Sequence, residues 1–235
     1  MLYSESMPKQ KAYCLIPARG GSKRIPRKNI KLFHGKPLIA WSIEVAKSSG
    51  LFEEVYVSTD DVEIATISEY YGAVAPFLRP KDLSNDYALD HEVRAHFINW
   101  ANTKSLEIDI LCYLYATAPF ITTNTLIECK DLLVTNDVTE VFTVTSYAYP
   151  VLRALKTDEN GFLTYVWDKF ADSRSQELPE YLHDAGQCYF YNLRRKHNIP
   201  SRLGFKLPRY QCQDIDTSED FVYAESLFRA SYRSN

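Results

Sequence analysis

The sequence predicts an α/β fold built on an open, mostly parallel, twisted sheet with helices on both faces. Apolar runs of strand length alternate with stretches of helical spacing from residue 12 to residue 145. The first run, residues 12–18, is apolar throughout, which is typical of a central parallel strand that is covered on both faces. Polar and charged motifs follow the ends of these runs, where ligands of such sheets bind.

The composition indicates one globular domain of ordinary kind. The 235 residues suffice for a single sizeable α/β domain. Hydrophobic residues make up 46% and charged residues 24% of the chain. The net charge of −3 argues against a general nucleic-acid surface, so any basic cluster is a local feature.

The chain also lacks the marks of a membrane or secreted protein. No apolar stretch is long enough to span a bilayer. Residues 1–10 carry no signal-peptide core, and we interpret them as a disordered start before a single domain over residues 11–235. Five scattered cysteines without a C-x-x-C pair favour buried thiols in a reducing compartment, and therefore the cytoplasm.

The first half of the chain predicts strands and helices in alternation. A helix begins after Pro37, which suits a first helical turn, and ends near Gly50. A second helix begins after Asp61 and is stopped by Gly72. Further strands are expected at residues 54–58, 73–78, 108–116 and 140–145, and further helices at residues 90–102 and 122–133.

The pattern changes at residues 146–180, which are rich in tyrosine and proline. Residues 157–162 could join two strands of a hairpin, so this segment is interpreted as an insertion that leaves the sheet. A plain surface flap is the alternative. Beyond it we expect strands at residues 187–192 and 210–215, a short helix at residues 194–199, a loop at residues 200–203, and a final helix from Asp216.

A glycine-rich, cationic loop follows the first strand and is the leading candidate for ligand binding. Two glycines allow close approach to the main chain, and successive N–H groups can cup an anion. Cationic side chains can neutralise phosphate oxygens, so the loop predicts a triphosphate site. A solvated basic turn is the alternative, since neither a Walker pattern nor G-x-G-x-x-G is present. The cations are Arg19, Lys23, Arg24, Arg27 and Lys28.

Two aspartates near the C-terminus form a candidate metal site. Asp214 and Asp216 are two residues apart, and alternate side chains of an extended segment share a face. Both carboxylates could therefore hold one magnesium ion together with substrate phosphates. Alternatively, Asp216 caps the last helix and Glu219 completes a capping box.

The loop sequence of residues 13–29 resembles the signature of the cytidylyltransferases that activate nonulosonic acids, the CMP-sialic acid synthetase group. The resemblance extends from about Lys11 to the C-terminal helix. It implies a Rossmann-like sheet of the nucleotide-diphospho-sugar transferase type, with CTP bound by the loop. It assigns catalytic roles to Arg19, Lys23 and Asp216, and a metal-binding role to Asp214 and Asp216. The implied nucleotide contacts are Arg19, Gly20, Gly21, Ser22, Lys23, Lys28 and Asn29.

The resemblance also implies sugar contacts. Tyr115 stands where the sialic acid enzymes carry glutamine, which favours the branch that acts on pseudaminic acid. Asp86 could instead cap a loop, and a His-Asp dipeptide on a loop is often only solvated, so no general base is assigned. Arg174 is a single arginine where relatives often have two. The implied sugar contacts are Arg79, Asp86, Tyr115, Arg174, His183 and Gln187.

The implied reaction transfers CMP from CTP to the anomeric hydroxyl of a nonulosonic acid and releases pyrophosphate. It would serve bacterial surface-glycan or flagellin glycosylation, with magnesium, or manganese in its place, as cofactor. The insertion at residues 146–180 would form a homodimer. Alternatives are the same reaction on sialic, legionaminic or 3-deoxy-octulosonic acid, a nucleotide-binding module without catalysis, and an oxidoreductase, against which the missing G-x-G-x-x-G argues.

Overall fold

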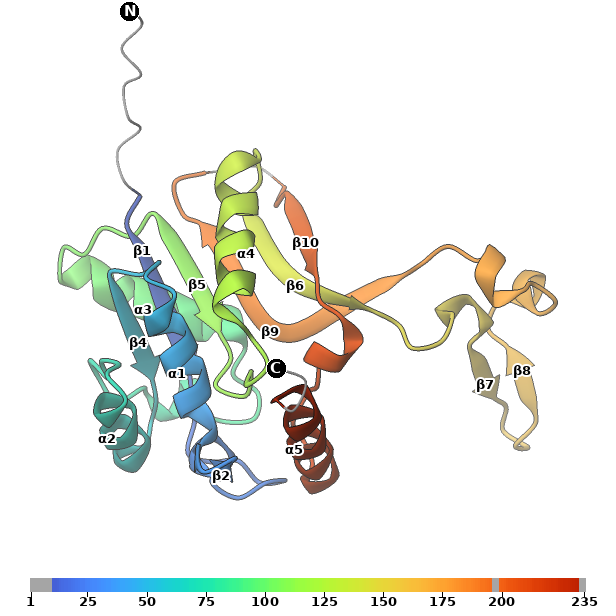
Figure 1. Cartoon of the computed structure of the whole chain (residues 1–235), viewed down its shortest axis with the longest axis horizontal. Helices are drawn as coiled ribbons and strands as arrows, with labels where there is room; N and C mark the ends of the chain where they lie inside the picture. The colour runs from blue at the N-terminus through green and yellow to red at the C-terminus, as the bar shows by residue number, and fades with distance from the viewer. Residues whose placement is uncertain (1–9, 196–198, 233–235) are drawn as a thin grey trace, which may run out of the picture.

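A computed structural model describes residues 10–195 and 199–232 and confirms the α/β architecture. Six strands form one sheet in the order β10-β6-β9-β5-β1-β4 (Figure 1). Almost all of the expected disordered start, and the centre of the short helix expected at residues 194–199, lie outside the described residues. No helix in the described part of the chain is long and apolar enough to cross a membrane.

The centre of the sheet is parallel. Strand β1 (Ala12–Pro17) lies between β4 (Glu54–Ser58) and β5 (Ile110–Leu114) and runs parallel to both. Its side chains alternate between two cores, because Cys14 and Ile16 pack on one face and Leu15 on the other. Burial on both faces explains why this strand is apolar throughout.

The other half of the sheet contains one reversed strand. Strand β9 (Leu182–Asn192) is antiparallel to both β5 and β6 (Glu140–Ser146). Strand β10 (Arg202–Lys206) closes the edge parallel to β6. The prediction of a loop at residues 200–203 was therefore wrong for Arg202 and Leu203, which belong to β10. The sequence signal of this strand is weak because its residues alternate between exposed and half-buried.

Two expected strands are not strands of this sheet. Residues 73–78 make only isolated parallel bridges, from Val74 to Tyr56 and from Leu78 to Thr59. Residues 210–215 contain the end of a short 3-10 helix, Arg209–Gln211, and then an irregular segment. Asp216, which directly follows this segment, lines the cavity described below.

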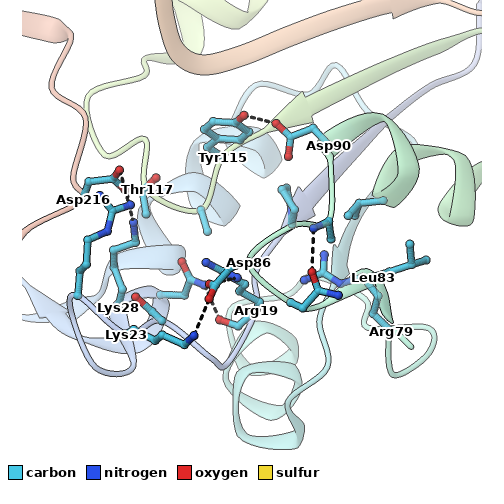
Figure 2. Close-up of a pocket in the computed structure, with 18 of the residues that line it drawn as sticks. Arg19, Lys23, Lys28, Arg79, Leu83, Asp86, Asp90, Tyr115, Thr117 and Asp216 are labelled. Carbon is cyan, nitrogen blue, oxygen red and sulfur yellow. Dashed lines mark hydrogen bonds and ion pairs between the residues drawn. The ribbon is translucent and has the colours of Figure 1, made fainter. Parts of the chain in front are cut away.

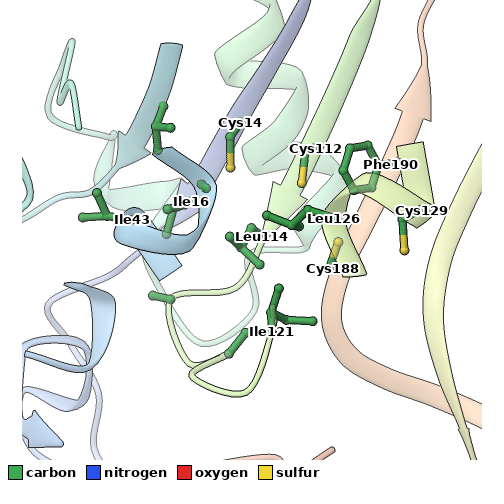
Figure 3. Close-up of a cluster of buried hydrophobic side chains, with 14 of the residues drawn as sticks. Cys14, Ile16, Ile43, Cys112, Leu114, Ile121, Leu126, Cys129, Cys188 and Phe190 are labelled. Atoms are coloured by element: carbon green, nitrogen blue, oxygen red, sulfur yellow. The ribbon is translucent and has the colours of Figure 1, made fainter. Parts of the chain in front are cut away.

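Helices cover both faces of the sheet. Helices α1 (Leu38–Ser48), α2 (Val62–Tyr70) and α4 (Thr123–Thr135) pack on the face that also buries four cysteines, Cys14, Cys112, Cys129 and Cys188 (Figure 3). Helix α3 (Asp90–Thr103) packs Val93 and Phe97 against the opposite face. Helix α5 (Ser218–Tyr232) packs on a smaller core around Phe33. The shorter elements are β2 (Leu32–Phe33), β3 (Lys36–Pro37), and the 3-10 helices Lys28–Ile30, Lys81–Leu83, Val151–Arg153, Asp168–Phe170 and Ser175–Glu177.

Between β6 and β9 the chain leaves the sheet and forms an arm. Strands β7 (Leu155–Thr157) and β8 (Leu163–Tyr165) pair as an antiparallel hairpin within it. Figure 1 shows this hairpin standing well away from the sheet and its helices. The arm displays large apolar side chains to solvent, among them Phe162 and Leu163, which are more than half exposed.

Candidate active site

A cavity of about 630 Å3 opens at the carboxyl ends of β1 and β5 (Figure 2). Its walls come from the cationic loop after β1, the loop that precedes α3, the end of β5, and the segment before α5. This is the edge where parallel sheets bind ligands. Ten residues singled out from the sequence line it: Arg19, Ser22, Lys23, Arg24, Lys28, Asn29, Arg79, Asp86, Tyr115 and Asp216.

Two loop cations meet one carboxylate on the first side of the cavity. Asp86 pairs with Arg19 at 2.7 Å and with Lys23 at 2.6 Å. The hydrogen bonds from Lys23 and then Arg19 lower the pKa of Asp86 below its ordinary value. The three side chains are partly exposed, so the cations can exchange this carboxylate for phosphate oxygens at small cost.

A second group of charges surrounds Asp216. Lys28 donates to the Ile215 carbonyl at 2.6 Å and to the Asp216 carboxylate at 3.1 Å, and Arg24 pairs with the same carboxylate at 2.6 Å. Burial alone would raise the pKa of Asp216, but the hydrogen bonds and charges of Lys28 and Arg24 together outweigh it, and the pKa is lowered. These contacts fasten the segment before α5 to the loop after β1.

The remaining loop cation has a structural task. Arg27 pairs with Asp61 and Glu63 at the start of α2 and does not line the cavity. Its hydrogen bond lowers the pKa of Asp61 to about 2. Arg24 and Arg27, which sequence reasoning could not separate, therefore divide into a cavity residue and a scaffold residue.

The two loop glycines also differ. The N–H of Gly20 donates to Asp60 at 2.9 Å, and a Cβ added at Gly20 would lie 2.6 Å from Oδ2 of Asp61. At Gly21 an added Cβ would meet nothing within 4 Å. Neither glycine lines the cavity, and Gly20 is needed for its close contact with the start of α2.

Two buried polar side chains hold the loop and the cavity wall. Asn29 donates from Nδ2 to the Arg19 carbonyl at 2.9 Å, which fixes the turn of the loop. Arg79 is only 5% exposed, donates from Nε to Oγ of Ser84 at 3.1 Å, and lines the cavity. Desolvation by burial lowers the pKa of Arg79, but an arginine stays cationic at neutral pH. It adds a buried positive charge beside the cavity.

The two aspartates of the candidate metal site are placed differently. Asp216 lines the cavity and Asp214 does not. Desolvation, and then the charge of Asp216, raise the pKa of Asp214. The alternative that Asp216 caps the last helix is wrong, because Thr217 is the cap. The Thr217 hydroxyl accepts from the Asp220 N–H at 3.2 Å, and the Asp220 carboxylate accepts from the Thr217 N–H at 2.7 Å. The carboxylate of Asp216 is thus directed at the cavity cations.

No group of three or more potential ligand residues (His, Cys, Asp or Glu) that could hold a metal exists in the described ranges. A metal here would need ligands from the substrate as well. Of the two predicted metal ligands only Asp216 lines the cavity, and one carboxylate is enough for magnesium, which often takes one or two and completes its shell with phosphates and water.

The expected sugar contacts fall into two groups. Arg79, Asp86 and Tyr115 line the cavity. His183 lines a neighbouring hollow and its ring packs on Tyr147. Gln187, another expected sugar contact outside the cavity, is 1% exposed and donates to the Gln211 carbonyl at 2.8 Å. Arg174 lies exposed on the arm, away from the cavity.

Sequence reasoning missed Asp90, the first residue of α3. Asp90 lines the cavity and accepts hydrogen bonds from the hydroxyls of Tyr113, at 2.9 Å, and Tyr115. The usable signal was the spacing of the two tyrosines, which puts Tyr115, directly after β5, on the same side as Tyr113 within the strand. The loop before α3 adds Leu83, Asn85 and Ala88, and the end of β5 adds Ala116 and Thr117.

The fold and the cavity together define an α/β protein that binds a polyanionic ligand at the carboxyl ends of its strands. Five cationic and three carboxylate side chains line the cavity, which leaves a local charge of +2 although the chain carries −3. Such a concentration of cations beside a glycine-containing loop is typical of a phosphate site.

Comparison with known proteins defines the class further. A family model described as Cytidylyltransferase matches residues 13–158, and the chain belongs to this family. The chain is 42% identical over 229 residues to the pseudaminic acid cytidylyltransferase of Campylobacter jejuni subsp. jejuni serotype O:23/36 (strain 81-176), covering 95% of this chain and 99% of that protein.

Two more distant relatives agree. The N-acylneuraminate cytidylyltransferase of Escherichia coli O18:K1:H7 (strain RS218 / NMEC) is 31% identical over 225 residues, which are 92% of this chain and 52% of that protein. The structure of CMP:2-keto-3-deoxy-manno-octonic acid synthetase complexed with CTP shares the fold, with a TM-score of 0.66 and 20% identity over 94% of this chain and all of that chain.

Proposed function

We propose that this protein transfers CMP from CTP to the anomeric hydroxyl of pseudaminic acid and releases pyrophosphate. The observation that carries the proposal is the cavity itself, in which the loop cations and Asp216 face Tyr115 across one space. The identity of 42% over almost the whole length of a pseudaminic acid cytidylyltransferase supports the same reaction.

The cations bind and orient the triphosphate. Arg19 can contact two phosphate oxygens through its planar guanidinium, and Lys23 and Lys28 act as point charges. Without ligand these cations pair with Asp86 and Asp216, so the phosphates exchange one set of anionic partners for another. The same charges stabilise the departing pyrophosphate, since positioning and electrostatics supply most of the rate in phosphoryl chemistry.

Magnesium is the proposed cofactor, with manganese able to replace it. Asp216 would hold the ion together with phosphate oxygens and water, and Asp214, two residues earlier and outside the cavity, would assist it. The ion supplies charge neutralisation on the phosphates. Arg24 and Lys28 keep Asp216 ionised by lowering its pKa, so the carboxylate is ready to bind a cation at neutral pH.

The acceptor sugar is proposed to lie between the phosphate-binding cations and the end of β5, against Tyr115 and Arg79. From there its anomeric oxygen can attack the α-phosphorus in line with the leaving pyrophosphate. The hydroxyl loses its proton as the new oxygen–phosphorus bond forms. No single side chain of the cavity is assigned as the base.

The arm is proposed to form a homodimer. Phe162, Leu163 and Tyr149 are 69%, 65% and 84% exposed, and an arm this apolar is typical of a surface that packs against a second copy. The second copy could bring Arg174 to an active site, which would explain its distance from the cavity of its own chain. A cytoplasmic location is also proposed and is supported by five cysteines that form no disulfide.

A pyrophosphate-release assay with CTP and magnesium tests the reaction. Pseudaminic, sialic, legionaminic and 3-deoxy-octulosonic acids are offered in parallel, and we expect the highest kcat/KM with pseudaminic acid. Higher kcat/KM with another acid would reassign the acceptor. CTP binding without pyrophosphate from any of them would instead indicate a nucleotide-binding module, and the proposed reaction would be wrong.

A further inference from the structure

Asp90 forms a hydrogen-bonded group with Tyr113 and Tyr115, and all three residues line the cavity. Figure 2 shows Asp90 and Tyr115 on the side away from Lys23 and Lys28. Tyr113 lies in β5 and Tyr115 directly follows the strand, and these two residues, two positions apart, project to the same side. The Tyr113 hydroxyl donates to Oδ1 of Asp90 at 2.9 Å, and the Tyr115 hydroxyl donates to Oδ2. One carboxylate therefore holds both phenols.

Asp90 is not needed to cap the N-terminus of its own helix, α3. The capping of α3 is done by Glu92, whose carboxylate accepts from the Leu89 N–H at 2.8 Å. The two other carboxylates that line the cavity, Asp86 and Asp216, are each paired with two cations. Asp90 differs from both, because it accepts hydrogen bonds from two neutral phenols of the cavity wall.

This arrangement decides what Tyr115 can offer a ligand. A phenol has one hydrogen to donate and lone pairs that accept. The hydrogen of Tyr115 is committed to Asp90, so its oxygen can only accept. Burial, and then the bond to Asp90, keep the pKa of Tyr115 well above its ordinary value, so the phenol remains protonated and neutral.

A neighbouring phenol is committed in the same way. Tyr189 lies on β9 with its ring 5.6 Å from that of Tyr115, and its hydroxyl donates to the carboxylate of Asp184 at 2.8 and 2.9 Å. Both hydroxyl hydrogens point to carboxylates. Tyr189 and Asp184 do not line the cavity, so Asp90 and Tyr115 supply the acceptors on this side, whereas Lys23 and Lys28 lie on the opposite side.

Given the proposed function, we infer that Asp90 is a positioning residue that makes Tyr115 a hydrogen-bond acceptor for a donor group of the acceptor sugar. The donor is an acylamino N–H or a hydroxyl. The same polarity excludes the sugar carboxylate from this side and directs it toward the cations, because an acceptor beside an anion is repelled. Asp90 and Tyr115 thus determine the orientation in which the sugar binds.

Steady-state kinetics of Tyr115→Phe and Asp90→Asn test the inference. Both variants should raise the KM of the acceptor about tenfold and leave the KM of CTP within about twofold, since one hydrogen bond to the sugar is lost. Asparagine keeps the shape of Asp90 but can donate to Tyr115 and turn its hydrogen toward the ligand. Tyr70→Phe, on the exposed surface of α2, and Asp131→Asn, on α4, are matched controls and should leave both constants unchanged.

The double variant separates positioning from a general structural effect. If Asp90 acts through Tyr115, the double variant should raise the acceptor KM no further than Tyr115→Phe alone. An analogue with a hydrogen atom in place of the acylamino group, used as a competitive inhibitor, identifies the donor. If the variants weaken it as much as the substrate, the donor is a hydroxyl; if they weaken only the acylated sugar, it is the N–H.

The failures are distinguishable. An active wild type whose two single variants keep the normal acceptor KM would overturn the inference alone. So would an equal rise in the KM of CTP, or additive effects in the double variant. If the wild type releases pyrophosphate with none of the four acids, the proposed function and the inference resting on it are both wrong.

Discussion

Replacing each loop glycine by alanine gives opposite expectations for two adjacent positions. A Cβ at Gly20 would lie 2.6 Å from Oδ2, 3.0 Å from Cβ and 3.1 Å from Cγ of Asp61. Asp61 cannot move freely, because it pairs with Arg27 and accepts from the Ile64 N–H at 3.0 Å as the cap of α2. Gly21→Ala meets nothing within 4 Å and is the matched control.

The magnitude follows from these contacts. Overpacking of this kind costs about 1–3 kcal/mol, and loss of the α2 cap costs about 1 kcal/mol. Gly20→Ala should therefore lower the free energy of unfolding by about 2–4 kcal/mol, and the Tm by roughly 4–16 °C in a chain of this size. Gly21→Ala should stay within about 0.5 kcal/mol of the wild type.

Urea unfolding followed by circular dichroism, together with a thermal scan, measures both variants. The reasoning is refuted if the two alanine variants have equal midpoints, or if Gly20→Ala is as stable as the wild type. The second result would mean that the segment around Asp61 can move away from the added Cβ without loss of stability, and that its contact with the loop does not shape the site.

The remaining predictions concern charge, metal and assembly. Asp216→Asn should lower kcat at least about tenfold and raise the magnesium concentration needed for half-maximal rate, whereas Asp214→Asn, outside the cavity, should do much less; equal effects would contradict the assignment. The pKa of Asp61 falls from an ordinary 3.8 to about 2 in the folded protein, so its contribution is complete above about pH 5 and is lost as the pH falls through about 2. That contribution is on the order of 1–2 kcal/mol after solvent screening, and Arg27→Ala should flatten the acid limb of the stability curve measured by urea unfolding from pH 2 to 5. Phe162→Ser with Leu163→Ser should shift the protein from dimer to monomer in light scattering, and a wild type that is already monomeric would contradict the proposed role of the arm.

The strands that are buried on both faces were the most predictable part of the fold. Strand β1 and strand β5 carry uninterrupted apolar runs because side chains on both faces are covered. Edge strand β10 was missed, since half of its residues face solvent and a glycine, Gly204, lies at its centre, where an added Cβ would come within 2.8 Å of Val144.

The antiparallel direction of β9 was beyond sequence reasoning as well. Its direction is set by how the chain returns from the arm, and an apolar run of strand length carries no signal for direction. The same holds for the segment before α5, where Ile215 is fully buried and mimics the apolar residue of a short strand.

The candidate site was predictable where one stretch of sequence carries the residues together. The loop after β1 holds most of the cavity cations within ten positions. Sequence alone could not tell Arg24 from Arg27, because their roles depend on Asp216 and Asp61, which are distant in the chain. Asp90 was missed for the same reason, since its role comes from two tyrosines on another element.

Calorimetric titration of CTP with magnesium into the wild type, Arg19→Ala and Arg27→Ala tests whether the loop after β1 holds the triphosphate. We expect one CTP bound per chain by the wild type and by Arg27→Ala, and binding at least about tenfold weaker by Arg19→Ala. Absence of binding heat with the wild type, or equal affinity of all three proteins, would contradict the claim that this loop holds the triphosphate.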